Sequence, residues 1–83
     1  MENQNEMTEE TKKAIAEIKE VIAAEKHLNV RSQRIYDLGY SVIEVPMGAG
    51  GVGQVREMKD CYRVQISRGR GKYNYAYAAI ISK

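Results

Sequence analysis

The stretch Asp60–Lys83, DCYRVQISRGRGKYNYAYAAIISK, decides the fold of this chain of 83 residues. It contains two runs rich in β-branched and aromatic residues, Cys61–Ser67 and Tyr73–Ser82. The segment RGRGK, residues 68–72, separates the two runs and supplies the glycines that tight turns favour. Two such runs on either side of a short glycine-containing segment predict a β-hairpin.

The register of this hairpin depends on its turn. Gly69 and Arg70 suit the central positions of a type II′ turn, which would pair Val64 with Tyr75. A loop that differs in length by one residue would exchange the two faces of the strands. With the type II′ turn, one face holds Tyr62, Val64, Ile66, Tyr73, Tyr75 and Tyr77, and the other holds Cys61, Arg63, Gln65, Asn74, Ala76, Ala78 and Ile80.

The N-terminal part of the chain is predicted to be helical. Thr8 is a suitable N-cap, and the apolar residues Ile15, Ile18 and Val21 recur at spacings of three. Lysines and glutamates occupy the positions between them, as on a helix with one apolar face. The pattern predicts a helix over Thr8–Lys26.

Two alternatives remain for the residues that follow. The helix continues through Asn29, a weak helix former, or it breaks near Asn29 and restarts. In both cases Gly39 is placed to end the helical region in a left-handed conformation, with Tyr40 packing back on the last turn. We expect His27, the only histidine, to be a solvated residue near a helix end.

The middle of the chain predicts two further strands. Ser41–Met47 alternates like a half-buried strand, and Pro46 places that strand at an edge or ends it. Gln54–Met58 follows after GAGGVG, residues 48–53, which matches G-x-G-x-x-G. No helix or suitably placed acidic residue follows the match, so it predicts a connecting loop and not a dinucleotide site. A second possibility is a loop whose backbone amides clamp an anion. Its residues would be Gly48, Gly50, Gly51 and Gly53.

These elements predict an α+β fold, with one N-terminal helix or two packed on a three- to four-stranded antiparallel sheet. We expect residues 1–7 to be a flexible N-terminus and residues 8–83 to form a single domain. A core of this size contributes little net stability. The last strand is apolar on both faces, so we also expect a homo-oligomer.

Composition excludes several classes of protein. A hydrophobic content of 43% and a charged content of 29% are those of a folded chain. No apolar run is long enough to cross a bilayer, and the acidic N-terminus is unlike a signal peptide, so we expect a cytoplasmic protein without a membrane partner. Cys61 is the only cysteine and cannot form an internal disulfide. With His27 it supplies too few ligands for a metal, and we expect no metal and no cofactor.

The net charge of +2 conceals an asymmetry. Residues 1–26 carry seven Glu and four Lys, whereas residues 27–83 carry nine Lys and Arg and four Asp and Glu. No carboxylate side chain follows Asp60, so the hairpin has no acidic side chain of its own. A cationic hairpin of this kind suggests an anionic partner.

The candidate ligand-binding residues belong to this hairpin. Guanidinium groups hold phosphate and tyrosine rings can stack on bases, which makes a phosphate-bearing ligand the expected partner. The residues concerned are Arg63, Arg68, Arg70, Lys72, Tyr73 and Tyr75. The tyrosines have two other interpretations, as core residues with hydroxyls at the rim or as part of a subunit interface.

The expected function is therefore that of a non-enzymatic binding protein. No catalytic set of residues is apparent in the sequence. The ligand is either a small nucleotide or nucleic acid. The alternative is a protein-interaction module, a small inhibitor or adaptor directed at a larger protein, such as a phage-encoded anti-defence protein.

Overall fold

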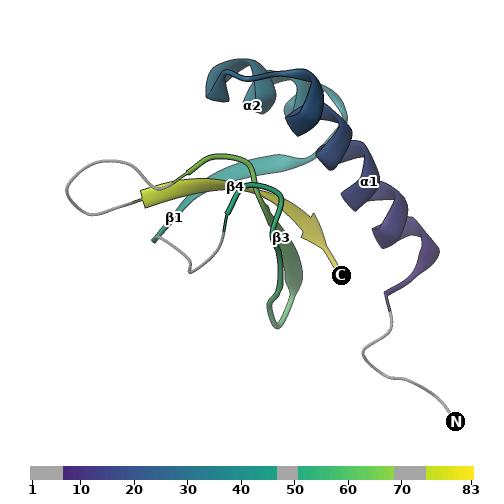
Figure 1. The fold of residues 1–83 in the computed structure, drawn as a ribbon. Helices are drawn as coiled ribbons and strands as arrows, with labels where there is room; N and C mark the ends of the chain where they lie inside the picture. The colour runs from purple at the N-terminus through teal and green to yellow at the C-terminus, as the bar shows by residue number, and fades with distance from the viewer. Residues whose placement is uncertain (1–6, 47–50, 69–74) are drawn as a thin grey trace, which may run out of the picture.

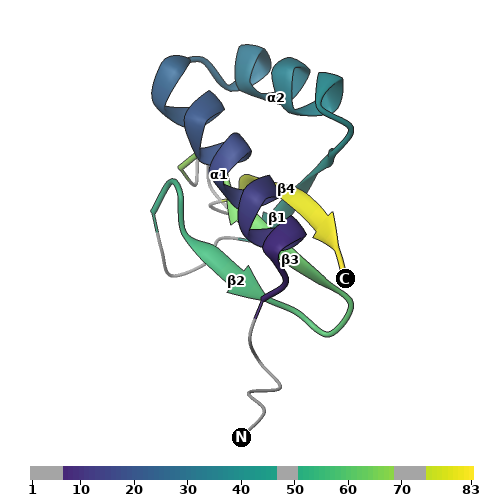
Figure 2. The ribbon, with the colours of Figure 1, turned by 90° about the vertical axis from the view of Figure 1, so that its right-hand side faces the viewer.

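Two helices lie on one face of a four-stranded antiparallel sheet (Figures 1 and 2). The computed structural model describes residues 7–46, 51–68 and 75–83. The elements are α1 (Glu9–Ala24), α2 (Leu28–Asp37), β1 (Ser41–Pro46), β2 (Val55–Glu57), β3 (Cys61–Gln65) and β4 (Tyr75–Ser82). The strand order is β1-β4-β3-β2, so β1 and β2 form the edges. The predicted α+β fold class is confirmed.

The first helix, α1, begins where the sequence predicts. The side chain of Thr8 accepts a hydrogen bond from the backbone N–H of Thr11 at 3.1 Å, as an N-cap does. Glu9 and Glu10 lie in the first turn, where the helix dipole favours negative charge. The buried face consists of Thr11, Ala14, Ile15, Ile18 and Val21. Met7, expected in the flexible N-terminus, packs against the same core.

The helical region breaks before Asn29, the weak helix former near which the sequence places a break. α1 ends at Ala24, two residues before the predicted end, and α2 starts at Leu28. His27 is the exposed N-cap of α2, as expected of a residue near a helix end. The break frees carbonyl groups at the end of α1, and a side chain from α2 bonds to them, as described below.

The end of α2 follows the prediction for Gly39. Gly39 has φ of +101°, a left-handed conformation in which glycine has no Cβ to clash. Its N–H donates to the carbonyl of Tyr36, and the N–H of Tyr40 donates to the carbonyl of Ile35. These two bonds form a Schellman motif, which turns the chain from α2 into β1.

The hairpin of β3 and β4 is present, but its predicted register is wrong. The structure pairs Val64 with Ala79 and Tyr62 with Ile81, a shift of four residues from the expected partners. The connection is therefore longer than a two-residue turn. Because four is an even number, each paired side chain that the structure describes keeps its predicted face although its partner differs.

The main core lies between the helices and the sheet. Ile18 and Val21 of α1 and Ile35 of α2 pack against Val64 and Ile81 of the sheet. Tyr62 is 6% exposed and belongs to this core, and Tyr77 packs against it. The interpretation of the tyrosines as core residues is confirmed for these two. Because Tyr77 and Ile81 are covered by the chain's own helices, they do not require a second subunit to cover them.

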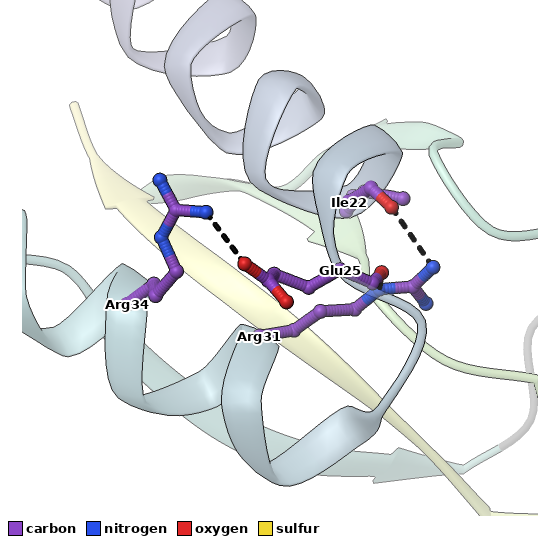
Figure 3. A network of polar contacts seen from close by, with 4 residues as sticks. All are labelled: Ile22, Glu25, Arg31 and Arg34. Atoms are coloured by element: carbon purple, nitrogen blue, oxygen red, sulfur yellow. Dashed lines mark hydrogen bonds and ion pairs between the residues drawn. The ribbon is translucent and has the colours of Figure 1, made fainter.

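A single arginine joins the two helices to the sheet. Arg31 of α2 donates to three backbone carbonyls: Ile22 at 2.9 Å and Glu25 at 2.6 Å at the end of α1, and Ile66 at 2.8 Å after β3. Figure 3 shows its guanidinium group beside Ile22 and Glu25, with Arg34 reaching the Glu25 side chain. Carbonyls left without partners at the end of a helix need donors, and Arg31 supplies them.

Candidate anion-binding face of the sheet

The face of the sheet opposite the helices is covered by no described helix or strand (Figure 1). We call this the open face. Side chains alternate along each strand, so the register assigns every other strand residue to it. None of these strand residues is acidic and none is aromatic. They are Ser41, Ile43, Val45, Arg56, Cys61, Arg63, Gln65, Ala76, Ala78, Ile80 and Ser82.

A shallow hollow lies on the open face and receives side chains from all four strands. Its enclosed volume is about 30 Å³, close to the share of volume that a water molecule occupies in the liquid. Ala78 and Val45, which line it, are already buried, and with Ala76 they form a second small core on this face. The hollow is lined by Val45, Pro46, Gln54, Arg56, Arg63, Gln65 and Ala78.

Two arginines lie directly opposite each other at this hollow. Arg56 of β2 and Arg63 of β3 are cross-strand partners, and both side chains lie on the open face. Like charges directly opposite each other on a sheet destabilise the pairing. The strand residues of this face include no carboxylate that could offset the repulsion. An anion bound between the two guanidinium groups would offset it.

Arg63 also has an unsatisfied donor. Its Nε is buried, and it has no hydrogen-bond partner within residues 7–46, 51–68 and 75–83. A buried donor without a partner costs about 1–3 kcal/mol, and more when the group is charged. Native structures usually satisfy such groups with protein, water or a bound ligand. Arg63 is also one of the residues that line the hollow.

Two glutamines complete the polar side of the hollow. Gln65 is buried, and its Nε2 donates to the carbonyl of Ser67 at 2.8 Å, which fixes the orientation of its amide. The backbone N–H of Gln65 donates to the carbonyl of Gln54, so the ladder of β2 and β3 continues to this position. Gln54 is exposed at the rim.

The glycines before β2 form a tight turn. The N–H of Gln54 donates to the carbonyl of Gly51 at 3.2 Å, and Gly53 has φ of +91°. The N–H of Gly53 donates to the carbonyl of Gln65 at 2.7 Å. The amides of Gly53 and Gln54 are therefore bonded within the chain and are not free to clamp an anion. Gly48 and Gly50, the other residues of the predicted anion loop, lie outside the described residues.

The structure separates the other predicted site residues. Arg63 lies at the hollow, whereas Tyr75 is on the opposite side of β4 and is 44% exposed. Arg68 is exposed just beyond β3. Arg70, Lys72 and Tyr73 lie outside the described residues.

Arg56 and Gln54 are residues of the candidate site that sequence reasoning missed. Alternation within β2 places Arg56 on one face, but only the pairing of β2 with β3 brings it opposite Arg63. A search of the sequence for cations on the same face of neighbouring strands would have found Arg56 only if the register of β2 and β3 were known.

Lys83, on the helix side of the sheet, is a cation with an acidic partner. Lys83 donates to Glu57 at 2.8 Å, and this hydrogen bond raises the pKa of Lys83. Lys83 also lies 5.0 Å from the centre of the Tyr62 ring. This cation therefore has a carboxylate partner, whereas the described strand residues of the open face offer none to Arg56 and Arg63.

The described parts of the chain contain no group of three or more His, Cys, Asp or Glu side chains placed to hold a metal ion. In the same residues no helix has the length and apolar character needed to cross a bilayer. Comparison of the chain with protein-family models, curated proteins and solved structures gives no match.

Proposed function

We propose that the protein is a non-enzymatic binding protein that holds a phosphate-bearing ligand at the hollow of the open face. The observation that carries the proposal is the pair of arginines, Arg56 and Arg63, with the buried Nε of Arg63, which has no partner among the residues that the structure describes. Guanidinium groups bind phosphate oxygens in bidentate fashion. One phosphate group would offset the repulsion between the arginines and satisfy the buried donor.

The charge distribution supports the same ligand class. The helix α1 carries glutamates, so the positive potential of the chain belongs to its C-terminal part. On the open face two arginines and two glutamines line one hollow. A few polar residues in a concave surface are the usual build of a site for a small ligand.

Isothermal titration with inorganic phosphate, nucleoside monophosphates and a single-stranded oligonucleotide tests this proposal. We expect binding by at least one of these ligands. We also expect Arg63→Gln to weaken that binding by about 10- to 100-fold, since a hydrogen bond to a charged group contributes about 1.5–3 kcal/mol. Arg63→Gln should fold normally, because it removes a repulsive charge.

Arg34→Gln is the matched control. It removes the same charge from the exposed surface of α2, where Arg34 pairs with Glu25, and it should leave ligand affinity unchanged. The proposal fails if no phosphate-bearing ligand binds. It also fails if Arg63→Gln and Arg34→Gln weaken binding equally, because the effect would then depend on net charge and not on the hollow.

A protein partner is the second candidate function. Val30, Tyr36 and Leu38 of the α2 region are large apolar residues that remain exposed in the described structure, at 38%, 53% and 44%. Exposed apolar groups of this kind occur at protein interfaces. A chain that binds no phosphate compound but forms a defined complex that Tyr36→Ser disrupts would favour this candidate.

A further inference from the structure

We propose that a second copy of this chain pairs with the outer edge of β1. The two copies of β1 run antiparallel about a two-fold axis at Ile43 and join the two sheets into one. The proposal uses neither Arg56 nor Arg63, so it stands or falls separately from the proposed phosphate site.

The two edges of the sheet differ in what protects them. β2 has three residues and carries Arg56, and a short edge strand with a charged side chain resists pairing with another chain. β1 has six residues, and its only charged residue is Glu44. Its outer side pairs with no strand within residues 7–46, 51–68 and 75–83. β1 is therefore the edge to which a further strand can add.

The alternation of backbone hydrogen bonds identifies the groups of β1 that face β4. The N–H of Ile66 donates to the carbonyl of Tyr77, so Tyr77 and every second residue along β4 direct their backbone groups toward β3. The residues between them, such as Ala78, direct theirs toward β1. Ala78 is the partner of Ile43, so the backbone groups of Ile43 are bonded to β4.

The residues on either side of Ile43 therefore direct their backbone groups outward. These are Val42 and Glu44, and no described residue accepts a hydrogen bond from their N–H groups. The hydroxyl of Tyr36 donates to the carbonyl of Val42 at 3.3 Å, which agrees with an outward direction. Pro46 has the same orientation, and there its missing N–H removes no bond to β4.

One register satisfies these outward groups in both copies. When Val42 faces Glu44 of the second copy, each such pair exchanges both backbone bonds, and Ile43 meets Ile43. The next register would oppose Glu44 to Glu44 and Val42 to Pro46, which adds a repulsion and lacks a donor. The register in the other direction needs the N–H of Tyr40, which is already bonded in the turn after α2.

The side chains around this edge are complementary to those of a second copy. Ile43 is 40% exposed, and Tyr36 and Leu38 are exposed at the end of α2, just before β1. The two-fold axis puts the helices of both copies on the same side of the joined sheet. Glu44 of the second copy then lies opposite Val42, where the hydroxyl of Tyr36 can donate to its carboxylate.

Hydrogen exchange on the wild-type chain tests the proposal. The amides of Val42 and Glu44 should exchange about tenfold or more slowly where sedimentation equilibrium shows a dimer than after dilution to monomer. The amide of Ile43 is the internal control. It is bonded to β4 within one chain, so its exchange should depend little on protein concentration.

A disulfide between the copies tests the register. In a Cys61→Ser background, Ile43→Cys places two thiols opposite each other in a non-hydrogen-bonded pair. Their Cα atoms would be about 4.5 Å apart, within the range that a disulfide spans. We expect diamide to convert most of this variant to a covalent dimer.

Ser41→Cys in the same background is the matched control. Ser41 is exposed on the same face of β1. In the proposed register the two copies of this position lie roughly 13 Å apart along the strands, which is too far for a disulfide. Diamide should leave this variant without a covalent dimer.

Three results would overturn the proposal. The first is a wild type that stays a folded monomer at every concentration up to the millimolar range. The second is a dimer in which exchange at Val42 and Glu44 does not depend on concentration, because the contact then lies elsewhere. The third is a disulfide that forms as readily in Ser41→Cys as in Ile43→Cys.

Discussion

Arg31 and Arg63 are both half-buried arginines, yet their surroundings differ. Arg31 donates to three backbone carbonyls, whereas the buried Nε of Arg63 has no partner within the described residues. The first arrangement satisfies a charged group that the fold has partly removed from water, as stability requires. The second leaves the free-energy cost of a buried donor, and no described residue offsets that cost by accepting a hydrogen bond from it. We therefore assign Arg31 to the stability of the fold and propose Arg63 for binding.

Replacement of Arg31 tests its assignment to the stability of the fold. Arg31→Met leaves the carbonyls of Ile22, Glu25 and Ile66 without their donor, and we expect it to lower the free energy of unfolding by about 2–4 kcal/mol. The measurement is urea denaturation followed by circular dichroism.

Arg34→Gln is the control for this measurement. It removes an ion pair with Glu25 whose arginine side chain is 49% exposed, and it should cost less than about 1 kcal/mol. Equal losses in the two variants would show that Arg31 acts through charge alone.

At the scale of elements, the pairing of β2 with β3 links stability to the proposed binding site. The two strands place Arg56 opposite Arg63, a pairing that favours neither strand. β2 is a short edge strand of three residues, so one cross-strand pair is a large share of its contacts. A repulsive pair is tolerated there because the rest of β3 is held by β4.

Arg56→Glu should raise the stability of the protein and abolish the proposed binding. It creates an opposite-charge pair with Arg63, and we expect the free energy of unfolding to rise by about 0.2–1 kcal/mol. Binding of any phosphate compound should be lost, because the new carboxylate takes the place of the anion. Thermal melts and titration of the same sample measure both effects. A variant that loses stability, or that keeps wild-type affinity, would contradict the assignment of Arg56 to the site.

The turn from α2 into β1 gives a second prediction for an element. A Cβ at Gly39 would meet open space, so Gly39→Ala changes only the backbone conformation. Its left-handed φ should cost about 1–2 kcal/mol. Gly51→Ala is the control: a Cβ there also meets open space and the backbone is outside the left-handed region, so we expect a change within about 0.5 kcal/mol. Thermal unfolding of both variants checks the difference.

At the scale of the whole molecule, the exposed apolar residues bear on association between chains. Tyr77 and Ile81 are covered by the helices, which removes one reason to expect a homo-oligomer. Other apolar residues remain exposed near the β1 edge, among them Tyr36, Leu38 and Ile43, the last at 40%. The hydroxyl of Tyr36 donates to the carbonyl of Val42, which places this ring beside β1.

We still expect a homo-oligomer at micromolar concentration, with contacts through these residues and not through Tyr77. Sedimentation equilibrium should give a mass above the 9.4 kDa of one chain. Ile43→Glu should shift the protein toward monomer without loss of folding, whereas Tyr77→Glu should unfold it. A wild type that sediments as a folded monomer would contradict this expectation.

The sequence by itself determined the features that depend on neighbouring residues. Thr8 as an N-cap, Gly39 as the end of the helical region, and the alternation of β1 were all predicted, because each is set by contacts within one turn or one strand. The faces of β3 and β4 were also predicted, because alternation depends only on whether a residue is an odd or even number of positions away.

The tertiary structure alone decided which distant residues meet. The pairing of Val64 with Ala79 depends on the length of the connection between β3 and β4, which the glycines permit but do not fix. The break after α1 depends on Arg31, a donor supplied by the next helix. Arg56 reaches Arg63 only through the register of two strands, so the candidate site is a product of strand pairing and not of a local motif.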